Sequence, residues 1–121
     1  AVEEISIAAF VSMHNSSLRM IDVRETDEYE SGHIPGAVNI PLSEFAARVS
    51  EVGADKVVYM ICRSGARSMQ ACEICIDSDI NGVKNVAGGT MGWIASGRDI
   101  VTGGFQGGFE WVDSESALND V

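Results

Sequence analysis

The segment VVYMICRSGARS, residues 57–68, joins an apolar run to a short polar loop that contains a cysteine, two arginines and a glycine. Five of the six residues from 56 to 61 are apolar and do not alternate with polar ones, which is typical of a central parallel strand covered on both faces. Residues 65 to about 77 have the composition of the longest helix in the chain. The order strand, loop, helix therefore predicts one unit of a parallel sheet.

The same alternation extends to both sides of this segment. Further strands are predicted at residues 19–23, 37–40 and 82–86, with short helices between them. The residues expected to cap the starts of these helices are Ser6, Thr26, Ser43 and Thr90. The predicted fold class is α/β, a mostly parallel central sheet with helices on both faces.

Composition limits the classes of function. With 121 residues, 45% hydrophobic and 21% charged, the chain suits one globular domain without a membrane-spanning segment. The net charge of -10 argues against nucleic acid or an anionic membrane as a partner. Three cysteines form no dense disulfide framework and favour a reducing compartment, the cytoplasm. A processed exported protein is the alternative, because the chain begins Ala-Val-Glu-Glu without Met.

The end of the chain differs from the rest. Residues 101–111 repeat GGF and hold four of the thirteen glycines. We expect a domain over residues 1–102 and a Gly-rich, acidic tail over residues 103–121. The tail is expected to pack on the domain through its aromatic residues, Phe105, Phe109 and Trp111.

Cys62 lies at the predicted carboxyl end of the strand, where ligands bind in open α/β sheets. The small residues that follow it, Ser64, Gly65 and Ala66, let the backbone curl so that its N–H groups form an anion-binding nest. The start of the helix adds partial positive charge at the same place.

Two arginines flank this nest. Arg63 and Arg67 add full positive charges to a chain that is otherwise acidic. A cysteine beside arginine or a helix N-terminus has its pKa lowered from about 8.5, so Cys62 is predicted to be a thiolate nucleophile in a cradle for a small anion. The alternative is a buried cysteine at a strand end with arginines that face solvent.

Three motifs make the chain resemble a known family. They are IDVRETDEYESGHIPGAVNIP at residues 21–41, ICRSGARS at residues 61–68 and NVAGGTMGWIASG at residues 85–97. In this order and at this spacing they resemble a single-domain rhodanese, a thiosulfate sulfurtransferase. The resemblance covers residues 5–102, most of the chain.

The resemblance implies a rhodanese-like fold and a sulfur transfer through Cys62. Cys62 would attack the outer sulfur of thiosulfate, release sulfite and become a persulfide, from which cyanide or a thiol takes the sulfur. The amides of residues 63–67 would hold the persulfide, and Arg67 together with Arg63 would bind the sulfonate oxygens. No metal or organic cofactor is implied.

Other functions use the same residues. A persulfide carrier that receives sulfur from a protein partner in a sulfur relay needs the same thiolate, so the loop does not distinguish it from the transferase. A non-catalytic interaction or sensing domain is a rival that would more naturally have lost Cys62. A cysteine phosphatase or arsenate reductase is disfavoured because four residues separate Cys62 from Arg67 and related phosphatases have one more.

The flanking motifs are expected to support the site. Asp22 and Arg24 would brace it by hydrogen bonds, with Glu28 as an ion-pair partner. His33 is expected in a structural turn rather than as a general base, and Trp93 is expected to pack. The pair Cys72 and Cys75 falls inside the predicted helix and is expected to pack in the core rather than bind zinc or pair with Cys62.

Overall fold

The computed structural model describes residues 1–15 and 17–104. Its strands form one parallel five-stranded sheet in the order β1-β5-β4-β2-β3. The strands are β1 (Glu3–Ser6), β2 (Met20–Asp22), β3 (Val38–Asn39), β4 (Val58–Ile61) and β5 (Val83–Ala87). The helices are α1 (Ile7–Met13), α2 (Thr26–Ser31), α3 (Leu42–Phe45), the 3-10 helix η1 (Ala46–Glu51), α4 (Ala66–Asp77) and α5 (Gly89–Ala95).

Strand β4 is the centre of the sheet, as its apolar sequence predicts. It pairs with β5 on one side and with β2 on the other, and all four of its residues are buried. Because every strand is parallel, the carboxyl ends of β2, β4 and β5 meet at one edge. The loops that leave them therefore gather there.

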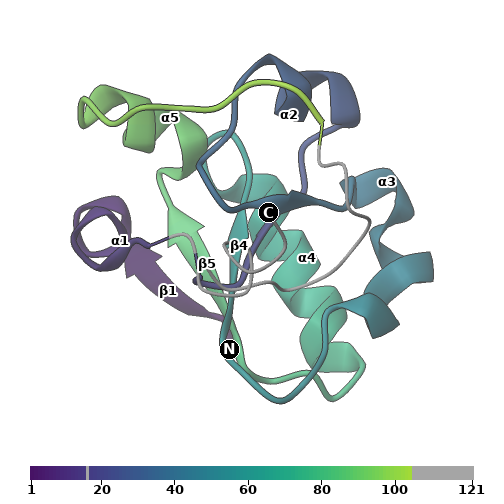
Figure 1. Ribbon diagram of the computed structural model, residues 1–121. Helices are drawn as coiled ribbons and strands as arrows, with labels where there is room; N and C mark the ends of the chain where they lie inside the picture. Colours follow the sequence, from purple (N-terminus) through teal and green to yellow (C-terminus); the bar gives the residue numbers. More distant parts are fainter. Residues whose placement is uncertain (16, 105–121) are drawn as a thin grey trace, which may run out of the picture.

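Helices cover both faces of the sheet (Figure 1). On one face α1, α2 and α5 contribute Phe10, Tyr29 and Trp93 to an aromatic core cluster. On the other face α3 and α4 contribute Phe45 and Cys72 to a mostly aliphatic cluster. The predicted α/β class with helices on both faces is confirmed. Within residues 1–15 and 17–104, no helix is both long enough and apolar enough to cross a bilayer.

Strand β1 is absent from the sequence-based expectations. Its residues, Glu3–Ser6, include two glutamates and are mostly exposed, so they show no apolar run. The strand lies at the edge of the sheet and pairs only with β5. One-sided pairing requires little burial, which explains why hydrophobicity does not reveal it.

Only one of the four predicted helix caps is confirmed. Ser6 caps α1 and accepts a hydrogen bond from the Ala9 amide at 3.2 Å. The N-cap positions of α2, α3 and α5 are instead Glu25, Pro41 and Gly88, so Thr26, Ser43 and Thr90 lie inside their helices. Each of these helices begins earlier than the hydroxyl residue suggests. At α2 the cause is a local capping box, in which the Glu25 side chain accepts from the Glu28 amide and the Glu28 side chain accepts from the Glu25 amide.

The loop after β4 is tied to the start of α5 by backbone hydrogen bonds. The amides of Thr90 and Met91 donate to the carbonyls of Cys62 and Arg63 at 2.9 and 3.0 Å. This contact is possible because Gly89 has no side chain. A Cβ at Gly89 would overlap the Cys62 carbonyl and lie 2.7 Å from the Arg63 carbonyl oxygen.

We predict that Gly89→Ala destabilises the domain by about 3 kcal/mol, because the new methyl group combines a left-handed φ of 55° with overlap of the loop backbone. Gly97→Ala is the matched control: Gly97 also has a positive φ, of 81°, but a Cβ there meets nothing within 4 Å. Its cost should be about 1 kcal/mol. Urea denaturation measures both values. Equal losses in the two variants would contradict a steric role for Gly89.

Candidate active site

Cys62 follows the last residue of β4 and is 1% exposed. Its Sγ accepts a hydrogen bond from the Gly65 amide at 3.0 Å and from the Ser68 hydroxyl at 3.2 Å. Gly65 reaches this position with a φ of 118°, which only glycine adopts easily. The sulfur thus sits inside a loop whose donors point at it.

The bonds to α5 explain why these donors point inward. In a planar trans peptide the C=O and the following N–H point in opposite directions. The carbonyls of Arg63 and Ser64 accept hydrogen bonds from the amides of Met91 and Gly88 at 3.0 and 3.2 Å, on the outer side of the loop. The N–H groups of Ser64 and Gly65, which follow those carbonyls, are therefore turned toward Cys62.

The balance of burial and hydrogen bonding lowers the pKa of the Cys62 thiol. Burial is the largest single influence and raises the pKa. The Ser68 hydroxyl and the amides of Ser68, Gly65 and Ser64 lower it by bonding the thiolate, and together they outweigh burial. The pKa values of the other two thiols are raised: that of Cys72 to about 12, by burial first and then by the nearby Cys75, Glu4 and Glu73, and that of Cys75 to about 11, by burial.

Arg67 lies in the first turn of α4 and is held by a carboxylate. Its two terminal nitrogens donate to the two carboxylate oxygens of Glu28, on α2, at 2.7 and 3.0 Å. The hydrogen bond from Arg67 lowers the pKa of Glu28 to about 2, so the pair stays charged at neutral pH. Glu28 was expected to form an ion pair beside Asp22 and Arg24. In the structure, the Glu28 carboxylate is instead paired with Arg67.

Asp22 and Arg24 form a buried ion pair at the end of β2. The Arg24 guanidinium donates to Asp22 Oδ2 at 2.8 Å and to the Gly32 carbonyl at 2.8 Å, while the Arg24 amide donates to Asp22 Oδ1 at 3.0 Å. Neither side chain is more than 8% exposed. The pair connects β2 to the end of α2, beside the loop.

Arg63 differs from the other two arginines of the site. Its side chain is exposed, and within residues 1–15 and 17–104 it forms no hydrogen bond or ion pair. The charges of Arg24 and Arg67 are each matched by a carboxylate. Arg63 therefore supplies unmatched positive charge at the site.

A hollow of about 310 Å³ opens beside the loop, between α2 and α5. Arg24, Glu28 and Arg63 form its charged part, and the α5 side chains of Met91 and Ile94 form part of its apolar wall. This volume suits a small ligand.

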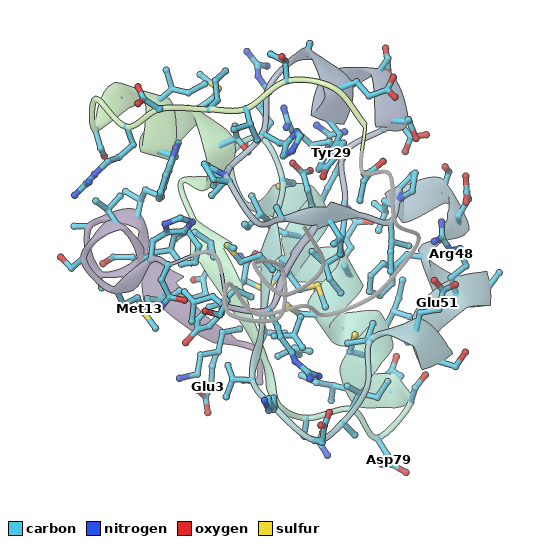
Figure 2. All side chains as sticks on the ribbon, in the orientation of Figure 1. Glu3, Met13, Tyr29, Arg48, Glu51 and Asp79 are labelled. Carbon is cyan, nitrogen blue, oxygen red and sulfur yellow. The ribbon has the colours of Figure 1, made fainter. Side chains whose placement is uncertain are left out.

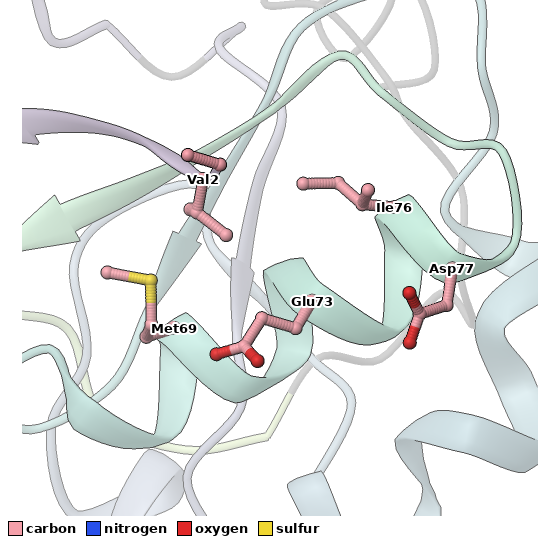
Figure 3. A pocket seen from close by; sticks show the side chains of 6 residues that line it. Val2, Met69, Glu73, Ile76 and Asp77 are labelled. Atoms are coloured by element: carbon pink, nitrogen blue, oxygen red, sulfur yellow. The ribbon is translucent and has the colours of Figure 1, made fainter.

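A second hollow, of about 400 Å³, lies between the start of the chain and α4 (Figure 3). Glu73 and Asp77 line it together with the apolar side chains of Val2, Met69 and Ile76. It contains no residue of the loop 62–67, and its carboxylates would repel an anion. Although it is larger than the first hollow, its charge does not suit an anionic substrate.

The remaining candidates have structural surroundings. His33 Nδ1 bonds the Tyr29 carbonyl at 2.8 Å and its ring stacks on Tyr29, while burial, the largest influence, lowers its pKa. Cys72 and Cys75 pack in the aliphatic core, and Trp93 packs against Phe10, as expected. In the part of the chain that the structure describes, no group of three His, Cys, Asp or Glu is placed to hold a metal.

Two residues of the site were not singled out from the sequence. Ser68 follows Arg67 in the first helical turn, and its hydroxyl donates to Cys62 Sγ at 3.2 Å. Asn85, on β5, donates to the Gly65 carbonyl at 3.1 Å and is fully buried. A polar amide in the middle of a buried strand was the signal that could have identified it.

Similar proteins are found among curated and structurally solved proteins. The chain is 41% identical over 95 residues to YrkF of Bacillus subtilis, which is named as a candidate sulfur carrier. The matching region covers 77% of this chain and 51% of YrkF. It is 35% identical over 85 residues to the thiosulfate sulfurtransferase PspE of Escherichia coli, covering 69% of this chain and 77% of PspE. The chain therefore spans only about half the length of YrkF.

A solved rhodanese-related protein of Thermoplasma volcanium superimposes with a TM-score of 0.73 at 30% identity, covering 82% of this chain and 97% of that one. The family model for the rhodanese-like domain matches residues 8–96, which include β4, the loop 62–67 and α5. The chain belongs to the rhodanese-like domain family.

Proposed function

We propose that this domain is a sulfurtransferase that moves sulfane sulfur from thiosulfate, or a similar anionic donor, to cyanide or a thiol through a Cys62 persulfide. The observation that carries the proposal is the buried Cys62 sulfur, which accepts hydrogen bonds from Gly65 and Ser68 in a loop whose Arg63 side chain has no partner among the described residues. The name of PspE supports thiosulfate as the donor.

The chemistry is a double displacement. The Cys62 thiolate attacks the outer sulfur of thiosulfate; a new S–S bond forms, the old one breaks, and its electron pair leaves with sulfite. The terminal sulfur of the persulfide takes the negative charge, which the loop amides stabilise. The acceptor then attacks that sulfur, and the electron pair of the Cys62 S–S bond restores the thiolate. No external oxidant or reductant is required.

A sulfur-relay carrier is the second candidate, and the name given to YrkF favours it. The same thiolate would accept sulfur from a persulfide on a partner protein instead of from thiosulfate. The rates at which the two donors load Cys62 separate the candidates. A non-catalytic sensing or interaction domain has no need of the hydrogen bonds that lower the pKa of Cys62.

Incubation with thiosulfate should add one sulfur atom to the protein, detected by intact mass. The adduct should be absent from Cys62→Ser, because Cys62 is the nucleophile, and should persist in Cys72→Ser, because burial keeps Cys72 protonated. Wild-type protein that gains no sulfur from thiosulfate or from a protein persulfide would refute the proposed function.

Ser68→Ala should move the pKa of Cys62 upward, because it removes a hydroxyl that donates to the thiolate. The pH dependence of Cys62 alkylation by iodoacetamide measures the change. Cys72 and Cys75 are internal controls and should stay unmodified at neutral pH. An unchanged alkylation profile would show that Ser68 does not stabilise the thiolate.

Arg63→Ala should raise the KM for thiosulfate about tenfold, since the variant loses the guanidinium that is free to bind the sulfonate. Arg67→Ala should raise it less, because the Arg67 fork is held by Glu28. Arg48→Ala is the control: Arg48 pairs with Glu44 and with Glu51 (Figure 2) and does not line the hollow beside the loop. A larger effect at Arg67 than at Arg63 would reverse this assignment.

A further inference from the structure

A buried asparagine on β5 contacts the reactive loop on the side away from Cys62. Asn85 is fully buried, and its side-chain nitrogen donates to the Gly65 carbonyl at 3.1 Å and to the Glu4 carboxylate at 2.9 Å. Side chains alternate between the two faces of a strand, so Asn85 lies on the same face as Val83, which packs in the aliphatic cluster with α4. Asn85 thus faces the helix whose first turn follows the loop.

The two partners of this amide fix its orientation. An asparagine side chain offers N–H donors on its nitrogen and an acceptor on its oxygen. Both neighbours, the Glu4 carboxylate and the Gly65 carbonyl, accept hydrogen bonds. The nitrogen of Asn85 must therefore face them, because a rotated amide would place its oxygen against two acceptors.

The stability of the fold does not explain an amide at this position. Asn85 Oδ1 has no hydrogen-bond partner among the described residues, and a buried acceptor without a partner is unfavourable. The other buried residues of β5, Val83 and Val86, are apolar. An apolar side chain in place of Asn85 would avoid the unpaired oxygen, and the Gly65 carbonyl would still accept the Met69 amide at 3.2 Å. The amide therefore has its use in the loop.

Two successive peptide groups of the loop are held from outside. The Ser64 carbonyl accepts the amide of Gly88, the residue after β5, at 3.2 Å, and the Gly65 carbonyl accepts the Asn85 side chain. Gly65 stands between these two contacts with a φ of 118°. Glycine has more backbone freedom than any other residue, so Asn85 restrains a peptide group that its own residue leaves mobile.

The restrained peptide group directs the Ala66 amide. Ala66 is the first residue of α4, so its N–H has no partner within the helix. In a planar trans peptide this N–H points opposite to the Gly65 carbonyl, and hence away from Asn85. The amides that bond the Cys62 thiolate are those of Ser64, Gly65 and Ser68. The Ala66 amide is left for an atom that lies beyond the Cys62 sulfur.

From these contacts we infer that Asn85 is a positioning residue for sulfur transfer. It holds the Gly65 carbonyl outward so that the Ala66 amide donates to the terminal sulfur of the Cys62 persulfide. The inference rests on the proposed function, in which that sulfur carries the negative charge. The terminal sulfur lies about 2 Å beyond the Cys62 sulfur, so it needs a donor of its own.

Asn85→Leu tests this role, because leucine has a similar shape and donates no hydrogen bond. The rate at which thiosulfate loads Cys62 should fall about tenfold, since a misdirected donor stabilises the developing charge less well. The urea midpoint should stay near that of the wild type, because the variant also removes the unpaired Oδ1. The pH profile of Cys62 alkylation should not change, because the Ala66 amide does not serve the thiolate.

Two results with Asn85→Leu overturn the inference. One is an unchanged rate of loading. The other is a loss of loading accompanied by an alkylation profile that moves to higher pH, since Asn85 would then act on the thiolate rather than on the persulfide.

Glu4→Ala is the matched control. It removes the other hydrogen bond of the same amide and leaves the bond to Gly65 in place. Loading by thiosulfate should therefore stay near the wild-type rate. A loss as large as that of Asn85→Leu would show that the amide acts by anchoring β1, which overturns the inference.

An NMR measurement on the wild-type protein separates this inference from the proposed function. A hydropolysulfide can form the persulfide directly: the Cys62 thiolate attacks its terminal sulfur, a new S–S bond forms, the old one breaks, and its electron pair leaves with the shorter chain. On loading, the amide proton signal of Ala66 should move downfield, and it should move less in Asn85→Leu. An Ala66 signal that does not move overturns the inference even if thiosulfate loads Cys62. A shift in protein that only polysulfide can load would support the role of Asn85 and refute the proposed transferase.

Discussion

Three backbone hydrogen bonds between the start of α5 and the loop after β4 determine the chemistry of this domain. They hold the carbonyls of residues 62–64 toward the amides of Gly88, Thr90 and Met91. Because each peptide is planar, the N–H groups of Ser64 and Gly65, which follow the Arg63 and Ser64 carbonyls, face the opposite way, toward the Cys62 sulfur. The site thus depends on how closely two loops approach, which in turn depends on the absence of a side chain at Gly89.

The charges around the loop are arranged so that little positive charge remains free. The chain carries a net charge of -10, and two of the three arginines near Cys62 are neutralised by Asp22 and Glu28. These two pairs join β2, α2 and α4 and so hold the rim of the site together. Of these three arginines, Arg63 alone has no carboxylate partner among residues 1–15 and 17–104, and it lines the hollow together with Met91 and Ile94.

Much of this could be predicted from the sequence. The apolar run before Cys62 predicted the central strand, and the small residues after it predicted a tight loop into a long helix; both are present. Strand β1 was missed because an edge strand needs little burial, and three helix starts were misplaced because Glu25, Pro41 and Gly88, rather than the nearby hydroxyl residues, occupy the N-cap positions. The predicted ion pair of Glu28 was also wrong. Glu28 and Arg67 are far apart in the sequence, and the sequence does not show that the first turns of α2 and α4 meet.

The sequence by itself determined the α/β class, the position of Cys62 at the end of the central strand and the family resemblance of its loop, because these follow from local patterns of apolar and small residues. Only the tertiary structure decided which groups reach the sulfur, which arginine is free and which apolar side chains surround the hollow. Ser68, Glu28 and Met91 lie on three different helices, and their contacts with the site arise from packing across the carboxyl edge of the sheet. Contacts between separate elements depend on how those elements pack, and local sequence patterns do not predict this packing.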